Sequence, residues 1–172
     1  MGSEIKYIDS GAQISPCEKY RFTLWRVWDE SLPHVAFVGL NPSTADAKLD
    51  DPTIRRCRGF AASHGFGAFT MLNLWAFRAT DPKNLPAVVT NEEEINADCI
   101  ARVASGVARV VAVWGAHPKG ILRKYAILPL VDEWWHLGMT KDGEPRHPLY
   151  LPGDAKMVRW SSRSPFNAVN GS

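Results

Sequence analysis

A short apolar run that ends abruptly in a polar loop constrains the fold of this chain most. Residues 35–38 (VAFV) are rich in strand-forming side chains and are bounded by turn residues, which is typical of a buried β-strand. The run continues into 39–44 (GLNPST), where glycine permits close backbone approach and Pro42 biases Asn41 towards an extended conformation. The sequence therefore predicts a central strand over 35–40 that ends in a loop of polar side chains.

Segments of strand and helix character alternate along the rest of the chain. Asp51 is the expected N-cap of the first helix, with Pro52 at its first helical position. The expected elements are strands at 20–28, 35–40, 69–74, 109–114 and 133–137, and helices beginning at Asp51, Asn91 and Lys119. Such alternation indicates βαβ units. The predicted fold class is α/β with a mostly parallel central sheet, preceded by an antiparallel strand at 20–28.

The length of 172 residues favours one domain. We expect a flexible lead-in over 1–16, a single α/β domain over 17–160 and a flexible tail over 161–172. The formal charge of +2 is too small to indicate nucleic-acid binding by itself, and the three cysteines form no zinc-binding pattern. The polar start and the lack of an apolar stretch of membrane-spanning length predict a cytoplasmic protein with reduced thiols.

Polar side chains follow each of the central strands, and the carboxyl ends of parallel strands meet at one edge of a sheet, where α/β proteins bind ligands. This reasoning gathers fourteen residues: Asn41, Ser43, Asp46, Asp50, Asp51, Arg55, Arg56, Asn73, Arg78, Asp81, His117, Lys141, Arg146 and His147. The chain has no GxxxxGK[ST], GxGxxG, GxSxG or HExxH motif. These absences disfavour a P-loop ATPase, a Rossmann oxidoreductase, a serine hydrolase and a zincin metalloprotease.

Two kinds of side chain in this set allow alternative interpretations. Asp46, Asp50 and Asp51 offer carboxylates for general-base chemistry or for a hard metal ion, but the same residues suit helix capping and surface solvation. Arg55 and Arg56 could clamp a phosphate or carboxylate, or lie on a solvated helix face.

The amide and imidazole side chains offer a second set of roles. Asn41 carries both a donor and an acceptor, so it could hold a water molecule or read the edge of a base. His117 and His147 could act as general acid or base, although a single histidine is more often structural. Cys57 is expected in a helix core rather than as a nucleophile.

Six stretches carry a resemblance to a known family: YRFTLWRVWD, LNPSTAD, DDPTIRRC, NLWAFRATDP, WGAH and LGMTKDGEPRHPLYLP. Over about residues 20–152 they resemble the bacterial and phage domain-of-unknown-function 1643 family. That family is named for its unknown function, so the resemblance implies no activity.

A wider resemblance is to the uracil-DNA glycosylase superfamily, whose mismatch-specific branch has a Gly-x-Asn-Pro-Gly/Ser loop like 39–43 here. The late His-Pro-Ser motif of that superfamily is incomplete in this chain, which has His147-Pro148-Leu149. The resemblance implies a three-layer α/β/α sandwich around a mostly parallel sheet. It also implies hydrolysis of an N-glycosidic bond in DNA or in a nucleoside or nucleotide, with Asn41 positioning water and Trp75 or Phe77 stacking on a flipped base.

The resulting hypothesis assigns Asn41, His147 and Asp46 to catalysis. The expected substrate-binding residues are Gly39, Leu40, Pro42, Ser43, Arg55, Arg56, Asn73, Trp75, Arg78, His117 and Arg146. The expected partner is a nucleobase, nucleotide or DNA, without a cofactor and without a membrane. The alternatives are a non-catalytic nucleotide or modified-base binding module and a metal-assisted hydrolase that uses Asp46, Asp50 or Asp51.

Overall fold

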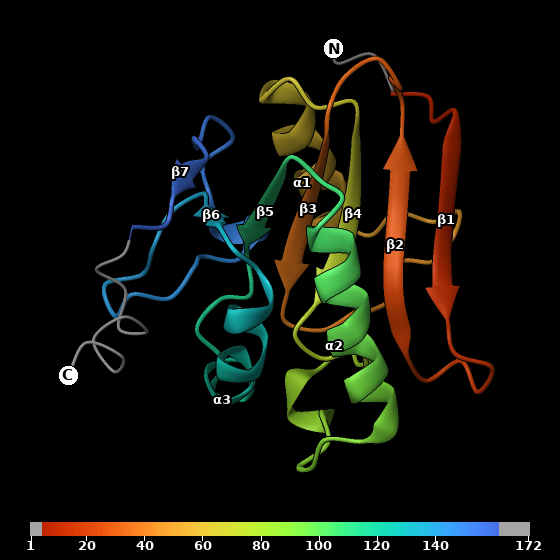
Figure 1. Cartoon of the computed structure of the whole chain (residues 1–172), viewed down its shortest axis with the longest axis vertical. Helices are drawn as coiled ribbons and strands as arrows, with labels where there is room; N and C mark the ends of the chain where they lie inside the picture. Colours follow the sequence, from red (N-terminus) through yellow and green to blue (C-terminus); the bar gives the residue numbers. More distant parts are fainter. Residues whose placement is uncertain (1–4, 162–172) are drawn as a thin grey trace.

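A seven-stranded mixed sheet forms the centre of the protein in the computed structural model, which describes residues 5–161 (Figure 1). The strand order is β1-β2-β4-β3-β5-β6-β7. The strands are β1 Asp9–Ile14, β2 Arg21–Val27, β3 His34–Gly39, β4 Ala68–Asn73, β5 Arg109–Ala112, β6 Trp134–His136 and β7 Val158–Arg159. The α-helices are α1 Pro52–Ser63, α2 Asn91–Ala104 and α3 Pro118–Ile127, and the 3-10 helices are η1 Pro82–Asn84, η2 Leu128–Leu130 and η3 Pro148–Tyr150.

The predicted α/β class is confirmed, but the mostly parallel sheet is not, because both margins of the sheet are antiparallel. Strands β4, β3, β5 and β6 are parallel neighbours. By contrast, β1 pairs with β2, β2 with β4, and β6 with β7 in antiparallel fashion. The antiparallel strand expected at 20–28 therefore lies inside the sheet, between β1 and β4.

The sequence analysis did not predict two of the strands, β1 and β7. Residues 9–14, which we expected within a flexible lead-in, form β1, whose sequence DSGAQI has little strand character. This strand is specified by its pairing with β2 rather than by its own composition. The two-residue β7 is likewise set by its pairing with β6. Most of the expected C-terminal tail, 162–172, lies outside the described residues.

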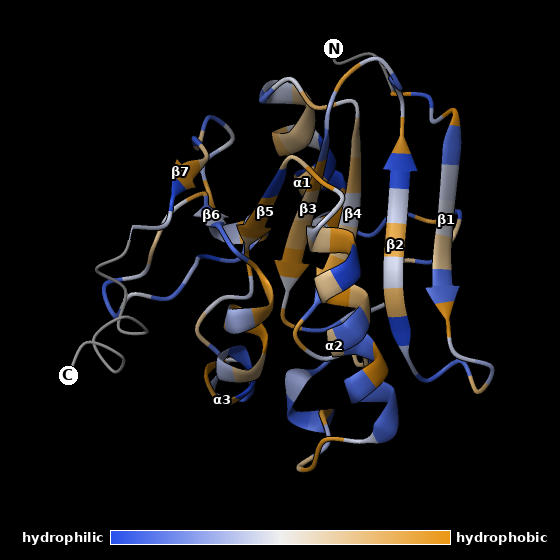
Figure 2. Cartoon of the chain, viewed as in Figure 1, coloured by the Kyte–Doolittle hydropathy of each residue, from blue (hydrophilic) through white to orange (hydrophobic). Residues whose placement is uncertain are grey.

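Apolar side chains of the central strands face both sides of the sheet, which places helices on both. Val35 and Phe37 of β3 belong to the core cluster that contains Ile54 and Phe60 of α1. The alternate residues Ala36 and Val38 belong to a second cluster, with Ile100 of α2 and Ile127 of α3. Figure 2 shows β3 and β5 largely in the hydrophobic colour, as expected for strands covered on both faces.

The first helix begins and ends where the sequence predicts. The Asp51 side chain accepts a hydrogen bond from Ile54 N at 2.9 Å, and Pro52 occupies the first turn. The chain leaves the helix at His64 and passes through Gly65, whose φ of 82° lies in the region that favours glycine. This fixed start places the N-terminus of α1 beside the loop that follows β3. No helix within residues 5–161 is both long and apolar enough to span a bilayer.

Candidate functional site

A pocket of about 260 Å³ lies where the central parallel strands end. The last residues of β3 and β4, Gly39 and Asn73, are register partners, and Val113 continues β5 by donating its amide to Val38 O at 2.8 Å. These strand ends form one side of the pocket, in the position where α/β sheets bind ligands. Seven residues of the predicted site line it: Gly39, Leu40, Asn41, Pro42, Ser43, Asn73 and His147.

Gly39 is required at the end of β3 by close packing. A Cβ atom built on it would lie 2.7 Å from Met71 Cε and 2.9 Å from Asn73 Oδ1. Any larger residue would therefore displace the Asn73 side chain, which lines the pocket.

Backbone carbonyls hold Asn41 in a fixed orientation. Its Nδ2 donates to Ala79 O at 2.7 Å and to Pro42 O at 3.1 Å. Ala79 N donates in turn to Pro42 O at 3.0 Å, so the loops after β3 and β4 are tied together. Within residues 5–161 the Oδ1 atom of Asn41 accepts no hydrogen bond, which leaves it available to a water molecule or a ligand.

His147 reaches the pocket on a loop that docks against the end of β5. Gly115 N donates to Pro145 O at 2.8 Å, and the His147 Cβ lies 3.7 Å from the position of a Cβ on Gly115. The His147 Nδ1 accepts a hydrogen bond from Leu149 N at 3.2 Å, so a neutral ring carries its proton on Nε2. Burial lowers the pKa of His147, against the opposing effect of the Asp51 carboxylate, and this favours the neutral ring.

A buried arginine that the sequence analysis did not select also lines the pocket. Arg21 is 2% exposed and its Nη1 donates to Ala45 O at 2.9 Å. Burial lowers its pKa to about 10, so the guanidinium remains charged at neutral pH. The Nε of Arg21 and the Nδ2 of Asn73 are both buried, and neither has a hydrogen-bond partner among the described residues. No local signal marks Arg21, because its burial depends on the loops that pack over β2.

Two other residues predicted for the site, Asp46 and Arg55, make structural contacts. The Asp46 side chain accepts hydrogen bonds from Lys48 N and Leu49 N, which also lower its pKa. Arg55 donates to Asp50 O at 2.8 Å. Neither residue lines the pocket.

Arg56 has a role different from the predicted one. It lies on α1 and donates to Pro148 O and Leu151 O, so it anchors the segment that follows His147. Its guanidinium also lies 5.0 Å from the Phe60 ring centroid. Arg56 therefore supports the position of the His147 loop without lining the pocket.

The remaining four predicted residues lie away from the pocket lining. Trp75 is 5% exposed, packs in the second core cluster and donates to Lys119 O. His117 caps α3 by accepting from Lys119 N at 3.2 Å. Arg78 and Arg146 donate to carbonyls of their surrounding loops.

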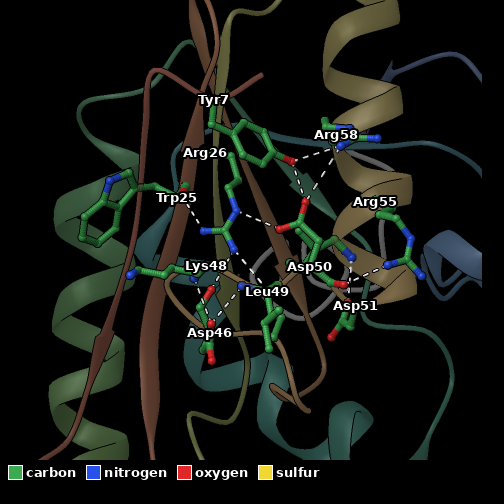
Figure 3. Close-up of polar contacts among 12 residues, drawn as sticks. Tyr7, Trp25, Arg26, Asp46, Lys48, Leu49, Asp50, Asp51, Arg55 and Arg58 are labelled. Atoms are coloured by element: carbon green, nitrogen blue, oxygen red, sulfur yellow. Dashed lines mark hydrogen bonds and ion pairs between the residues drawn. The ribbon is translucent and has the colours of Figure 1, made fainter. Parts of the chain in front are cut away.

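The aspartates proposed for a metal site are engaged separately. Asp50 accepts from Arg26 Nε at 2.8 Å and from Tyr7 Oη at 2.6 Å, with Arg58 3.9 Å away (Figure 3). Asp51 caps α1 and Asp46 closes its own turn. No group of three or more potential metal-ligating His, Cys, Asp or Glu side chains occurs in the part of the chain that the structure describes.

Comparison with known proteins identifies the family but not the activity. Residues 21–149 match the model of a family described as "Protein of unknown function (DUF1643)". The chain belongs to this family. No curated protein and no solved structure matches it significantly. The wider resemblance to the uracil-DNA glycosylase superfamily receives no support from these comparisons.

Proposed function

We propose that this DUF1643 protein binds a nucleobase in the pocket at the strand ends and hydrolyses an N-glycosidic bond there. The observation that carries the proposal is the convergence of Asn41 and His147, which are distant in sequence and line the same pocket. Both side chains are oriented by backbone groups, as catalytic groups need to be.

The two side chains suit complementary roles in such a reaction. The free Oδ1 of Asn41 accepts a hydrogen bond from the attacking water and directs its oxygen to the anomeric carbon. The carbon–nitrogen bond breaks as the carbon–oxygen bond forms, and the electron pair leaves with the base. The neutral His147 donates a hydrogen bond through Nε2–H to the departing base anion and keeps its proton. The proton that the attacking water loses passes through solvent to the base, so the products are a neutral free base and a sugar hydroxyl.

Replacement of Asn41 by alanine should reduce base release about 100-fold or more, the size of effect expected for a group that acts on the attacking water. The assay is chromatographic detection of free base from nucleosides, nucleotides and single-stranded and duplex oligonucleotides. Asn91→Ala is the matched control, because it makes the same chemical change at an exposed site at the start of α2. Melting temperatures of both variants separate loss of activity from loss of fold.

Two outcomes would count against catalysis. Base release by Asn41→Ala at the wild-type rate would show that Asn41 does not position water. Absence of base release by the wild-type protein, together with ligand-induced stabilisation, would favour the alternative of a non-catalytic binding module. A ligand at a hundredfold over its Kd adds about 2.7 kcal/mol to the free energy of unfolding, which a melting experiment detects.

A further inference from the structure

Strand β2 contains two fully buried arginines with different electrostatic environments. Arg26, with a side chain 0% exposed, pairs with Asp50 at 2.8 Å and also donates to the carbonyls of Trp25 and Asp46. The side chain of Arg21 makes only one hydrogen bond, to Ala45 O. The carboxylates of Asp51 and Asp46 favour its charge, but among the described residues no carboxylate forms an ion pair with it. A buried charge without a partner is destabilising, so a structure retains one only where something compensates it.

The unpaired guanidinium faces the pocket rather than the core. Arg21 and Asn73 both line it, and each has a buried N–H group that no described residue accepts. Asn73 is 1% exposed, and its side chain is held against Gly39. The pocket thus contains two fixed donors, one of them charged, that lack an acceptor oxygen. The Asp51 carboxylate also lines the pocket, but it is engaged as the N-cap of α1.

We propose that the ligand carries an anionic oxygen group that accepts a hydrogen bond from Arg21 Nε, with Asn73 Nδ2 as a second donor. The inference rests on the nucleobase proposal above and narrows its substrate class to mononucleotides that bear a phosphate. Guanidinium groups bind phosphate oxygens through charge-assisted hydrogen bonds, which are stronger than neutral ones.

The burial of Arg21 also favours a mononucleotide ligand over a nucleic-acid polymer. A guanidinium that is 2% exposed is accessible only to a group that enters the pocket, and the backbone phosphates of a duplex remain outside. Three arginines predicted to bind the substrate, Arg55, Arg56 and Arg146, donate to backbone carbonyls. The chain carries a formal charge of only +2, without the strong basic excess of many duplex-binding domains.

The test is calorimetric titration of the full chain with uridine and adenosine, each with and without a 5′-phosphate, and with ribose 5-phosphate. The better-bound nucleoside should bind about 10- to 100-fold more tightly with its phosphate, the gain expected from hydrogen bonds to a charged group. Arg21→Met should abolish this difference. Arg102→Met, which removes the same charge from an exposed site on α2, should preserve it.

The arms of the experiment separate the two proposals. Equal affinity for a nucleoside and its phosphate overturns the anion inference and leaves the nucleobase pocket standing. A second outcome is that ribose 5-phosphate binds in an Arg21-dependent way and that the nucleotides bind no more tightly than it does. This outcome supports the anion site and contradicts the nucleobase proposal. Absence of binding by all five compounds overturns both. The wild-type comparison decides the inference even where Arg21→Met fails to fold.

Discussion

Replacing Trp114 by alanine should lower the free energy of unfolding by about 3–5 kcal/mol, the cost typical of deleting a buried aromatic side chain. Trp114 is 1% exposed, as the sequence predicts, but it lies two residues beyond Ala112, where β5 ends, and not inside the strand expected over 109–114. Its ring packs edge-on against Trp134 at 5.3 Å and in a tilted arrangement against Trp160 at 5.9 Å. Truncation would therefore leave a cavity between β5, β6 and the C-terminal segment.

A polar contact adds to the cost of this substitution. The Nε1 of Trp114 donates to Glu144 Oε2 at 3.3 Å, and Glu144 also pairs with the buried Lys124. Chemical denaturation of wild type, Trp114→Ala and Leu122→Ala measures the effect. Leu122 is 76% exposed on α3, so its truncation should change the free energy by less than about 0.5 kcal/mol. An unchanged denaturation midpoint for Trp114→Ala would contradict its placement in the core.

Replacing Asp50 by alanine should destabilise the protein by about 3–5 kcal/mol, because it leaves the buried guanidinium of Arg26 without its ion-pair partner. The carbonyls that also accept from Arg26 should keep the loss near the lower end of this range. The hydroxyl of Tyr7 loses its acceptor as well, which frees the chain preceding β1 (Figure 3).

An exposed ion pair provides the control for this prediction. Arg159 and Glu133 lie 2.7 Å apart with side chains 70% and 44% exposed. Glu133→Ala should cost about 0–1 kcal/mol, the usual range for a solvated pair. Equilibrium unfolding of both variants gives the comparison, and similar losses for the two would show that burial of Arg26 does not determine the effect.

The elements that the sequence predicted correctly are those specified by local residue patterns. The apolar run of β3, the Asp51–Pro52 start of α1 and the glycine after its end are each specified by residues close in sequence. The convergence of Asn41, Asn73 and His147 followed from chain direction in a parallel sheet, which sequence alternation reveals.

The features that the sequence did not reveal depend on distant partners. Long guanidinium side chains such as Arg56 can reach carbonyls about 90 residues away, and nothing local to α1 identifies that acceptor. The burial of Arg21 follows from its contact with the loop after β3, and the polar strand β1 forms only because β2 offers it an edge. Sequence reasoning thus brought the strand-end residues of the pocket together but did not identify Arg21, the buried arginine that lines it.

The most direct test of the central claim, that this pocket is the ligand site, is a nuclear magnetic resonance titration of ¹⁵N-labelled protein with uridine 5′-monophosphate and adenosine 5′-monophosphate. We predict that at least one of them shifts the side-chain amide signals of Asn41 and Asn73 and the backbone amides of Leu40 and Ser43, all of which lie at the pocket. Shifts confined to residues remote from the strand ends, or no shifts at millimolar ligand, would contradict it.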